Sequence, residues 1–256
     1  MQTKIKSSES NIESESGMVV ERRFTSAGQD PFESFEWIEM DVQIRNPDGS
    51  MADSLEGVKL PSGFSGVPGT VCAQKYLRKA GVPKYLRKVP EDDVPVWLQR
   101  SEPDHERLQT VDAAERMGGE IDGRQLFRRL AGTWTYWGWK YGYFASEADA
   151  RAYFDEMCYL IASQRSAPNS PQWFNTGLHW AYGIEGPAQG HSYVDPDTGE
   201  LGRSTNAYEH PQPHACFIQS VSDSLVGGTD SIMGLWNREA LLFKYGSGTG
   251  SNFSNI

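Results

Sequence analysis

Apolar residues recur at helical spacing in the middle of the chain and predict two long helices. The first covers residues 122–143 and has one broad apolar face that is rich in Trp and Tyr. These rings could stack on nucleobases, but their helical period favours packing in a core. The second helix begins at Ser146, which with Asp149 resembles a capping box, and ends near residues 163–165. Its apolar stripe consists of Ala150, Tyr153, Phe154, Met157, Leu160 and Ile161.

The C-terminal third alternates between helix and strand patterns. A third helix begins at residue 229 or 230 and ends at the glycine cluster 246–250, where Gly246 is expected to be left-handed as a C-cap. Residues 214–218 predict a short buried strand, and residues 252–256 resemble the opening of another strand. This alternation indicates an α/β architecture. Because a parallel strand needs neighbours on both faces, we expect the chain to be the N-terminal part of a longer polypeptide.

Shorter extended signals precede the helices. Residues 35–42 alternate crudely between apolar and polar, and the Asn-Pro-Asp-Gly sequence at 46–49 predicts a turn after them. Residues 57–69 are interrupted by Gly and Pro, so we expect this segment to wind over a surface.

The first 21 or so residues are rich in Ser and Glu and offer almost nothing to bury. Such a segment cannot offset the entropy lost on ordering, which predicts a disordered tail. The chain therefore divides into a leader over residues 1–23, a helical and loop-rich region over 24–165, and an α/β segment over 166–256.

The composition excludes several functional classes. The chain has 256 residues and a formal net charge of −10, which argues against a nonspecific DNA or RNA binder. No run approaches the ~18 consecutive apolar residues of a membrane span, and the N-terminus lacks the apolar region of a secretory signal. Cys72, Cys158 and Cys216 are too few and too distant for a disulfide scaffold or a structural zinc site. We expect a cytoplasmic protein with neither a membrane nor a nucleic-acid partner.

The histidines give no support for a metal site. They fall in predicted loops, without the i, i+4 helical spacing or the paired carboxylates that a site would show: His179, His191, His210 and His214.

Residues 165–177, which follow the second helix, are the first candidate for chemistry. Their two prolines favour an extended chain. The hydroxyl of Ser170 and the backbone amides beyond it could accept a phosphate or a ribose. The alternative is a loop at the helix exit whose small polar groups satisfy the local backbone.

Cys216 is the second candidate. A thiol at a strand edge, preceded by His210 and His214, could act as a nucleophile or a redox group, because a neighbouring imidazolium favours the thiolate. The alternative is a buried and inert cysteine.

The glycine cluster 246–250 is the third candidate. It lacks the Lys-Ser/Thr of a P-loop and does not follow a strand as the dinucleotide fingerprint does. Its glycines would nevertheless let a ligand approach the backbone closely, and the alternative is a simple helix C-cap.

Taken in order, these segments resemble a known family. Ala-Pro-Asn-Ser-Pro-Gln-Trp-Phe-Asn-Thr-Gly at 167–177, His-Ala-Cys-Phe-Ile at 214–218 and Lys-Tyr-Gly-Ser-Gly-Thr-Gly-Ser-Asn-Phe-Ser-Asn-Ile at 244–256 are similar to the opening of the catalytic barrel of vitamin B12-dependent (class II) ribonucleotide reductase. The passage that begins Val-Cys-Ala-Gln-Lys-Tyr at residue 71 also resembles the long bacterial form of that family. The resemblance extends from about residue 24 to residue 256.

The resemblance implies a ten-stranded α/β barrel in which adenosylcobalamin generates a thiyl radical on a finger-loop cysteine. That radical removes the 3′ hydrogen of a ribonucleotide, the 2′ hydroxyl leaves as water, and a pair of cysteines reduces the sugar. Carried onto this chain, Cys216 matches the first of the reducing pair. The positions that match the substrate-binding surface are Asn169, Ser170, Gln172, Ala215, Gly248, Thr249, Gly250 and Ser251.

The family's radical cysteine and second reducing cysteine match no position up to Ile256, so we expect this chain alone to be inactive. The resemblance implies a ribonucleotide substrate and a thioredoxin-type or other dithiol reductant, and it leaves a homodimer open. Two other hypotheses stand beside the enzyme: a nucleotide-binding module without redox chemistry, and an interaction domain that docks a partner through the aromatic helix around Trp134 and Trp137.

Overall fold

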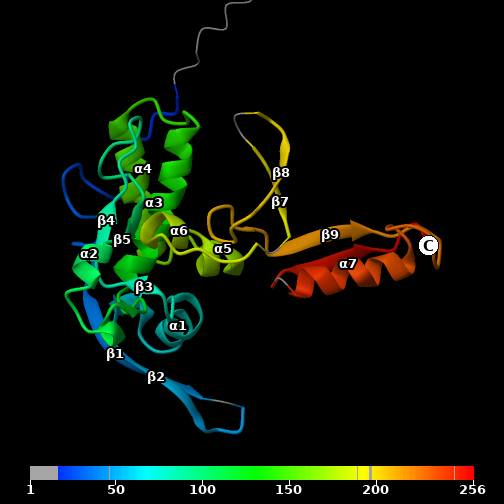
Figure 1. Ribbon diagram of the computed structural model, residues 1–256, viewed down its shortest axis with the longest axis horizontal. Coiled ribbons are helices and arrows are strands. Elements are labelled where there is room, and N and C mark those ends of the chain that lie inside the picture. Colours follow the sequence, from blue (N-terminus) through cyan, green and yellow to red (C-terminus); the bar gives the residue numbers. More distant parts are fainter. Residues whose placement is uncertain (1–16, 46, 189, 196–197, 245) are drawn as a thin grey trace, which may run out of the picture.

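The computed structural model describes residues 17–45, 47–188, 190–195, 198–244 and 246–256 (Figure 1). Its helices are α1 (Val67–Val71), α2 (His105–Leu108), α3 (Gly123–Lys140), α4 (Glu147–Ala162), α5 (Ser170–Asn175), α6 (Leu178–Tyr182) and α7 (Ile232–Lys244). Short 3-10 helices cover Ser62–Phe64 and Ala113–Glu115, and a π-helical turn covers Cys72–Tyr76. Figure 1 shows a helical body from which an arm containing β9 and α7 extends.

The strands of the described residues form two-stranded sheets, which pair as β1–β2, β3–β6, β4–β5, β7–β8 and β9–β10. Their bounds are β1 (Trp37–Arg45), β2 (Met51–Pro61), β3 (Val82–Pro83), β4 (Leu86–Lys88), β5 (Ser101–Pro103), β6 (Met117–Gly118), β7 (Ser192–Val194), β8 (Leu201–Arg203), β9 (Cys216–Ser220) and β10 (Gly248–Asn252). The mixed α/β class is therefore confirmed, whereas the described residues form no closed barrel.

The longest sheet of the described residues is the hairpin β1–β2, and residues 47–49 of the expected turn join its strands, while Asn46 lies outside the described residues. Gly49 adopts a φ of 85°, and the Ser50 N–H donates to Asp48 Oδ1 at 2.9 Å. β2 continues to Pro61, so the expectation that residues 57–69 wind over a surface is wrong at its start. Val58 and Leu60 are fully buried there, because they alternate along the strand and face the core.

Both predicted helices in the middle of the chain are confirmed, as α3 and α4, and they pack against each other. Asp122 caps α3 in a capping box with Gln125, and Ser146 Oγ accepts the N–H of Asp149 at the start of α4. The rings and aliphatic side chains between them form one core with β1 and β2, including Val58, Leu60, Leu126, Phe127, Leu130, Phe154, Cys158 and Ile161.

The buried surface of α4 is wider than the predicted stripe, because the N-terminal segment covers a second face. We call residues 17–25 the N-terminal strap. The Met18 N–H donates to Tyr143 O at 2.6 Å, and Arg22 pairs with Asp155 at 2.8 Å. Glu156 Oε1 accepts the backbone N–H of residues 23–25. The expected leader thus overlaps a hydrogen-bonded strap at 17–23, and its residues 1–16 lie outside the described residues.

The arm differs from the sequence-based expectation in two ways. β9 is exposed rather than buried, with the Ile218 side chain 83% accessible. The glycine cluster itself forms β10 over Gly248–Asn252, so the expectation of a strand over 252–256 is wrong. Pairing with β9 supplies the hydrogen bonds that extend these glycines, and Gly246, with a φ of 81°, turns the chain between α7 and β10 as expected.

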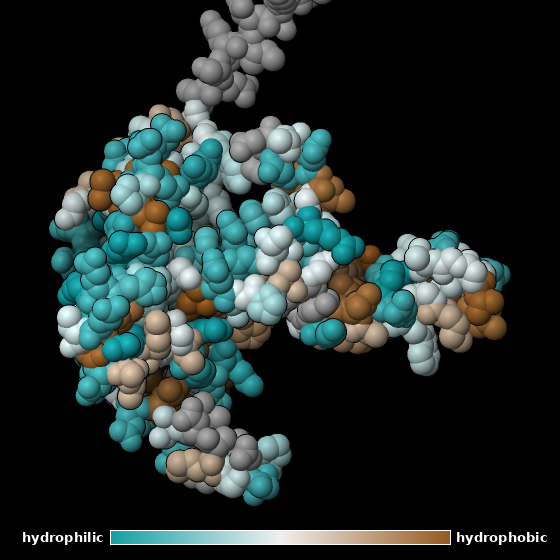
Figure 2. Space-filling model, viewed as in Figure 1, coloured by the Kyte–Doolittle hydropathy of each residue, from teal (hydrophilic) through white to brown (hydrophobic). Residues whose placement is uncertain are grey.

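Figure 2 shows apolar residues on the surface of the arm, where exposed side chains include Ile218, Met233, Trp236, Leu241 and Phe243. The helices in the described part of the chain are all too short or too polar to span a membrane.

Candidate functional site

The candidate site lies on a β-α-β unit made of β9, α7 and β10. The two strands are parallel, with Cys216 paired to Gly248 and Ser220 paired to Asn252, and α7 connects them. Because side chains alternate along a strand and paired residues of parallel strands share a face, the sheet has two chemically different faces.

One face of the sheet carries Cys216, Ile218, Gly248 and Gly250, and we call it the open face. A Cβ on Gly248 would lie 3.3 Å from Cys216 Sγ, and one on Gly250 would lie 3.0 Å from Ile218 Cδ1. Cys216 is exposed, and its neighbours on β10 have no side chains. The open face therefore presents a thiol beside bare backbone that a flat ligand can approach.

The opposite face is covered by α7 through polar contacts. Arg238 Nε donates to Gln219 Oε1 at 2.7 Å, and Ser251 Oγ donates to Glu239 Oε1 at 2.9 Å. Gln219 Nε2 donates to Thr249 Oγ1 at 2.7 Å. The structure thus separates the site residues that the sequence groups together, because the side chains of Thr249 and Ser251 point away from the open face.

Cys216 differs from the other two cysteines in its surroundings. Cys72 and Cys158 are buried in the core, and all three thiols are free. Burial raises the pKa of Cys72 to about 12 and raises the pKa of Cys158 well above its usual value. Since the thiolate is the reactive form, the core cysteines are poor nucleophiles, and Cys216 is the accessible thiol.

The histidines that precede Cys216 contact other groups. The His210 ring stacks on Tyr193 with centroids 3.9 Å apart, and the His214 ring lies against Phe217, with centroids 5.7 Å apart. Phe217 belongs to the covered face, so this geometry does not favour activation of the thiol by a neighbouring imidazolium. The backbone just before β9 is held by Ser247, whose hydroxyl donates to His214 O at 2.9 Å.

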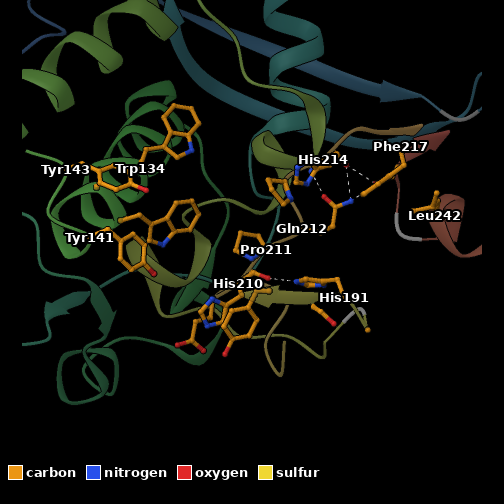
Figure 3. Close-up of a pocket in the computed structure, with 18 of the residues that line it drawn as sticks. Trp134, Tyr141, Tyr143, His191, His210, Pro211, Gln212, His214, Phe217 and Leu242 are labelled. Carbon is orange, nitrogen blue, oxygen red and sulfur yellow. Dashed lines mark hydrogen bonds between the residues drawn. The ribbon is translucent and has the colours of Figure 1, made fainter. Parts of the chain in front are cut away.

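An aromatic cavity of about 980 Å³ lies between the C-terminal end of α3 and residues 209–214, which precede β9 (Figure 3). Trp134 and Tyr141 line one side and Phe217 lines the other, next to Cys216 in sequence. The predicted aromatic face of α3 is thus divided: Leu126, Phe127 and Leu130 are core residues, whereas the rings nearer the C-terminus border a cavity.

The prolyl segment forms a short helix, α5, rather than the extended chain expected from its prolines. Asn169 caps it by accepting the Gln172 N–H at 3.4 Å, and Pro171 occupies the first turn, where the missing N–H costs nothing. Asn169 and Ser170 are exposed. Gln172 Oε1 accepts the indole N–H of Trp134 at 3.1 Å, which links α5 to the wall of the aromatic cavity.

Sequence reasoning missed a buried ion pair that holds α5 in place. The Arg129 side chain is 1% exposed and Nε donates to Glu120 Oε1 at 2.7 Å. The guanidinium also donates to the carbonyl oxygens of Thr176 and Trp173 at 2.6 and 2.9 Å, at the C-terminal end of α5. Tyr182 OH donates to Glu120 at 2.8 Å. A signal was available, because Arg129 falls on the same helical face as the buried core residues of α3.

Within the ranges described above, His, Cys, Asp and Glu side chains form no group of three or more that could hold a metal ion.

Comparison with known proteins places the chain in a family. A family model described as class II vitamin B12-dependent ribonucleotide reductase matches residues 39–164. The vitamin B12-dependent ribonucleotide reductases of Agrobacterium fabrum and Bradyrhizobium diazoefficiens are 61% and 58% identical to this chain over 239 residues, 93% of its length. That of Rhodopirellula baltica is 31% identical over 241 residues, 94% of the chain.

These matches define the class of protein as a vitamin B12-dependent ribonucleotide reductase. The chain belongs to the class II vitamin B12-dependent ribonucleotide reductase family as a partial chain, and the resemblance drawn from its motifs is confirmed. It spans 19% of the length of the Agrobacterium and Bradyrhizobium relatives.

Proposed function

We propose that this chain supplies one reducing thiol and part of the substrate surface of a ribonucleotide reductase that makes deoxyribonucleotides for DNA synthesis and repair. The observation that supports the proposal is the position of Cys216. It is an exposed thiol at the first residue of β9, and it faces Gly248 across the parallel pair. A cysteine on a strand is held more rigidly than one on a loop.

In the proposed reaction, Cys216 and a second cysteine each give up one proton and one electron. A disulfide bond forms between the two sulfurs, and the C2′–O bond of the ribonucleotide breaks. One proton leaves with the hydroxyl as water, and the two electrons and the other proton form a C2′–H bond in its place. Ribonucleotide and dithiol therefore become deoxyribonucleotide, disulfide and water. A thioredoxin-type or other dithiol then reduces the disulfide to restore the thiols.

Two parts of the chain, β10 and the start of α5, are proposed to form the substrate-binding surface. Gly248 and Gly250 lie on the same face as Cys216 and leave room for a ribose. Asn169 and Ser170, at the exposed start of α5, are proposed to meet the phosphates. The side chains of Thr249 and Ser251 face α7, so their proposed contribution is limited to backbone groups and to the shape of β10.

The β-α-β unit is proposed as the beginning of the ten-stranded barrel. Parallel strands joined by a helix are the unit from which such barrels are built. Ile218 on the open face is 83% exposed and Trp236 on α7 is 70% exposed, as expected for surfaces that further barrel elements would cover.

Adenosylcobalamin is the proposed cofactor, because the relatives are named vitamin B12-dependent. When bound, it would supply the radical chemistry of the reaction. The described residues do not by themselves enclose a site for a group of this size: the open face is uncovered, and the nearby aromatic cavity is lined by the rings of α3 and by residues that precede β9. We therefore assign no residue of this chain to the cofactor.

Replacement of Cys216 by Ser in the complete enzyme tests the proposal. We expect dithiol-dependent turnover to fall to background while ribonucleotide binding persists, and we expect Cys158→Ala, which removes a buried thiol, to retain turnover. Full turnover of C216S would contradict the reductase role. A nucleotide-binding module without redox chemistry would instead predict unchanged function in both variants.

The isolated 256-residue chain offers a second test. Supplied with adenosylcobalamin, a ribonucleotide and a dithiol, it should form no deoxyribonucleotide, because Cys72 and Cys158 are buried and leave Cys216 without a partner for the disulfide. Robust product formation would show that the chain contains more of the catalytic machinery than we propose.

A further inference from the structure

A second cavity, of about 460 Å³, lies between α3 and α6. Its polar and charged lining residues include Arg100, Lys140, His179, Glu185, Glu209 and His210. It adjoins the aromatic cavity, since both are bordered by Trp137 and His210, but neither Cys216 nor the glycines of β10 line it. We call it the α3–α6 cavity.

Arg100 is a half-buried cation without a counter-ion in the described part of the chain. Some other arginines of the body do have carboxylate partners: Arg87 pairs with Glu102 at 2.6 Å, and Arg129 pairs with Glu120 at 2.7 Å. Because a guanidinium stays charged at any physiological pH, an unpaired one inside a cavity favours an anionic ligand.

The hydroxyl of Thr133 is a second, independent group in this cavity that lacks a hydrogen-bond partner among the described residues. The residue lines the same cavity and is 2% exposed, and no described group hydrogen-bonds to its hydroxyl. Thr135, two positions further along α3, is buried too, but its hydroxyl donates to Ala131 O at 2.7 Å. Leaving a buried hydroxyl unpaired is unfavourable by about 1–3 kcal/mol, which a ligand acceptor would relieve.

The remaining walls define the shape and charge of a ligand. The rings of Trp137, Trp180 and Tyr208 line the cavity and suit a flat group. Burial lowers the pKa of His179, so its ring is neutral near pH 7 and has one N–H to donate. Glu185 and Glu209 are exposed and belong to the rim, whereas the interior carries the unpaired Arg100.

We propose that the α3–α6 cavity is a binding site for a small planar organic anion, an aromatic carboxylate, whose carboxylate oxygens meet Arg100 and Thr133 while its ring lies between the aromatic walls. This site is separate from the proposed reductase function, and it stands or falls independently of it.

Calorimetric titration of the 256-residue chain with benzoate tests the site, with benzamide as the neutral analogue of the same shape and acetate as the anion without a ring. We expect benzoate to bind with a Kd on the order of 1 mM, as its size allows. Benzamide and acetate should each bind roughly tenfold more weakly or not at all. Equal binding of benzoate and benzamide, or no heat with benzoate, would overturn the proposal.

Two substitutions assign the binding to these residues. Arg100→Gln should weaken benzoate binding by roughly tenfold, whereas Arg107→Gln, which alters an exposed arginine stacked on Tyr85, should leave it unchanged. Thr133→Val should weaken binding by several-fold and leave the fold intact, because it removes a hydroxyl without a partner. Undiminished benzoate binding by correctly folded R100Q would also overturn the proposal.

Discussion

At the scale of single residues, burial determines which of the three cysteine thiols can react. Cys72 and Cys158 sit in the core with raised thiol pKa values, and Cys216 stands on an exposed strand. Spacing alone left open whether Cys216 was reactive or inert, because burial depends on which elements cover a strand. In the structure, the Cys216 thiol is exposed.

Selective alkylation follows from this difference. Treatment of the native chain with iodoacetamide near pH 8 should label Cys216 at least tenfold faster than Cys72 or Cys158, since buried thiols react only after opening of the fold. Peptide mapping by mass spectrometry measures the three rates. Comparable labelling of all three cysteines before denaturation would show that this account of burial is wrong.

Gly132 gives a second prediction at this scale. A change from Gly to Ala inside an exposed helix stabilises by ~0.5–1 kcal/mol. Here a Cβ would lie 2.2 Å from the ring of Trp180, whose indole N–H is fixed on Leu98 O. Gly132→Ala should therefore destabilise, by about 1–3 kcal/mol in urea denaturation. Gly118→Ala, where no atom lies within 4 Å of the added carbon, is the control with little expected change.

At the scale of elements, the helical period and the cap residues predicted α3 and α4 well, because those signals are local. Strand burial was predicted poorly. The apolar residues within 214–218 favour a buried strand. Burial of β9, however, depends on which other elements pack against it, and residues 214–218 alone do not reveal them. The glycines of β10 have low strand propensity, and only pairing with β9 makes them extended. Helical spacing places Arg129 on the buried face of α3, but its partner Glu120 lies outside that helix, so spacing alone does not identify the pair.

That ion pair is expected to contribute strongly to the placement of α5. Glu120→Gln leaves the Arg129 charge buried and uncompensated, so it should destabilise the chain by about 3–5 kcal/mol. Asp30→Asn removes the partner of Arg128 from a pair that is exposed on both sides, and should cost no more than about 1 kcal/mol. Denaturation midpoints measure both. Similar small effects of the two substitutions would contradict the role given to the buried pair.

At the scale of the whole molecule, the N-terminal strap joins the start of the described chain to α4. Burial raises the pKa of Glu156, but hydrogen bonds from Thr25 Oγ1 and from the backbone N–H of residues 23–25 lower it by more, so the net pKa is lowered. A lowered pKa in the folded state means that this stabilisation is present above the usual pKa of a glutamate, ~4.3, and is lost as the pH falls through the lowered value.

The strap should therefore loosen in acid. In NMR titrations, the amide signals of residues 23–25 should shift together with an apparent pKa below ~4.3. Glu156→Gln should abolish that transition, whereas Glu21→Gln, at an exposed position on the strap, should keep it. Identical titrations of these amides in the two variants would exclude Glu156 as the anchor.

The central claim is that, in the complete enzyme, Cys216 is one of the two thiols that reduce the substrate. The most direct measurement is a single turnover of pre-reduced enzyme without external dithiol, followed by acid quenching, alkylation and peptide mapping. We expect Cys216 to be recovered in a disulfide with a second cysteine, in proportion to the deoxyribonucleotide formed. Product formation with Cys216 still fully alkylated as a free thiol would contradict it.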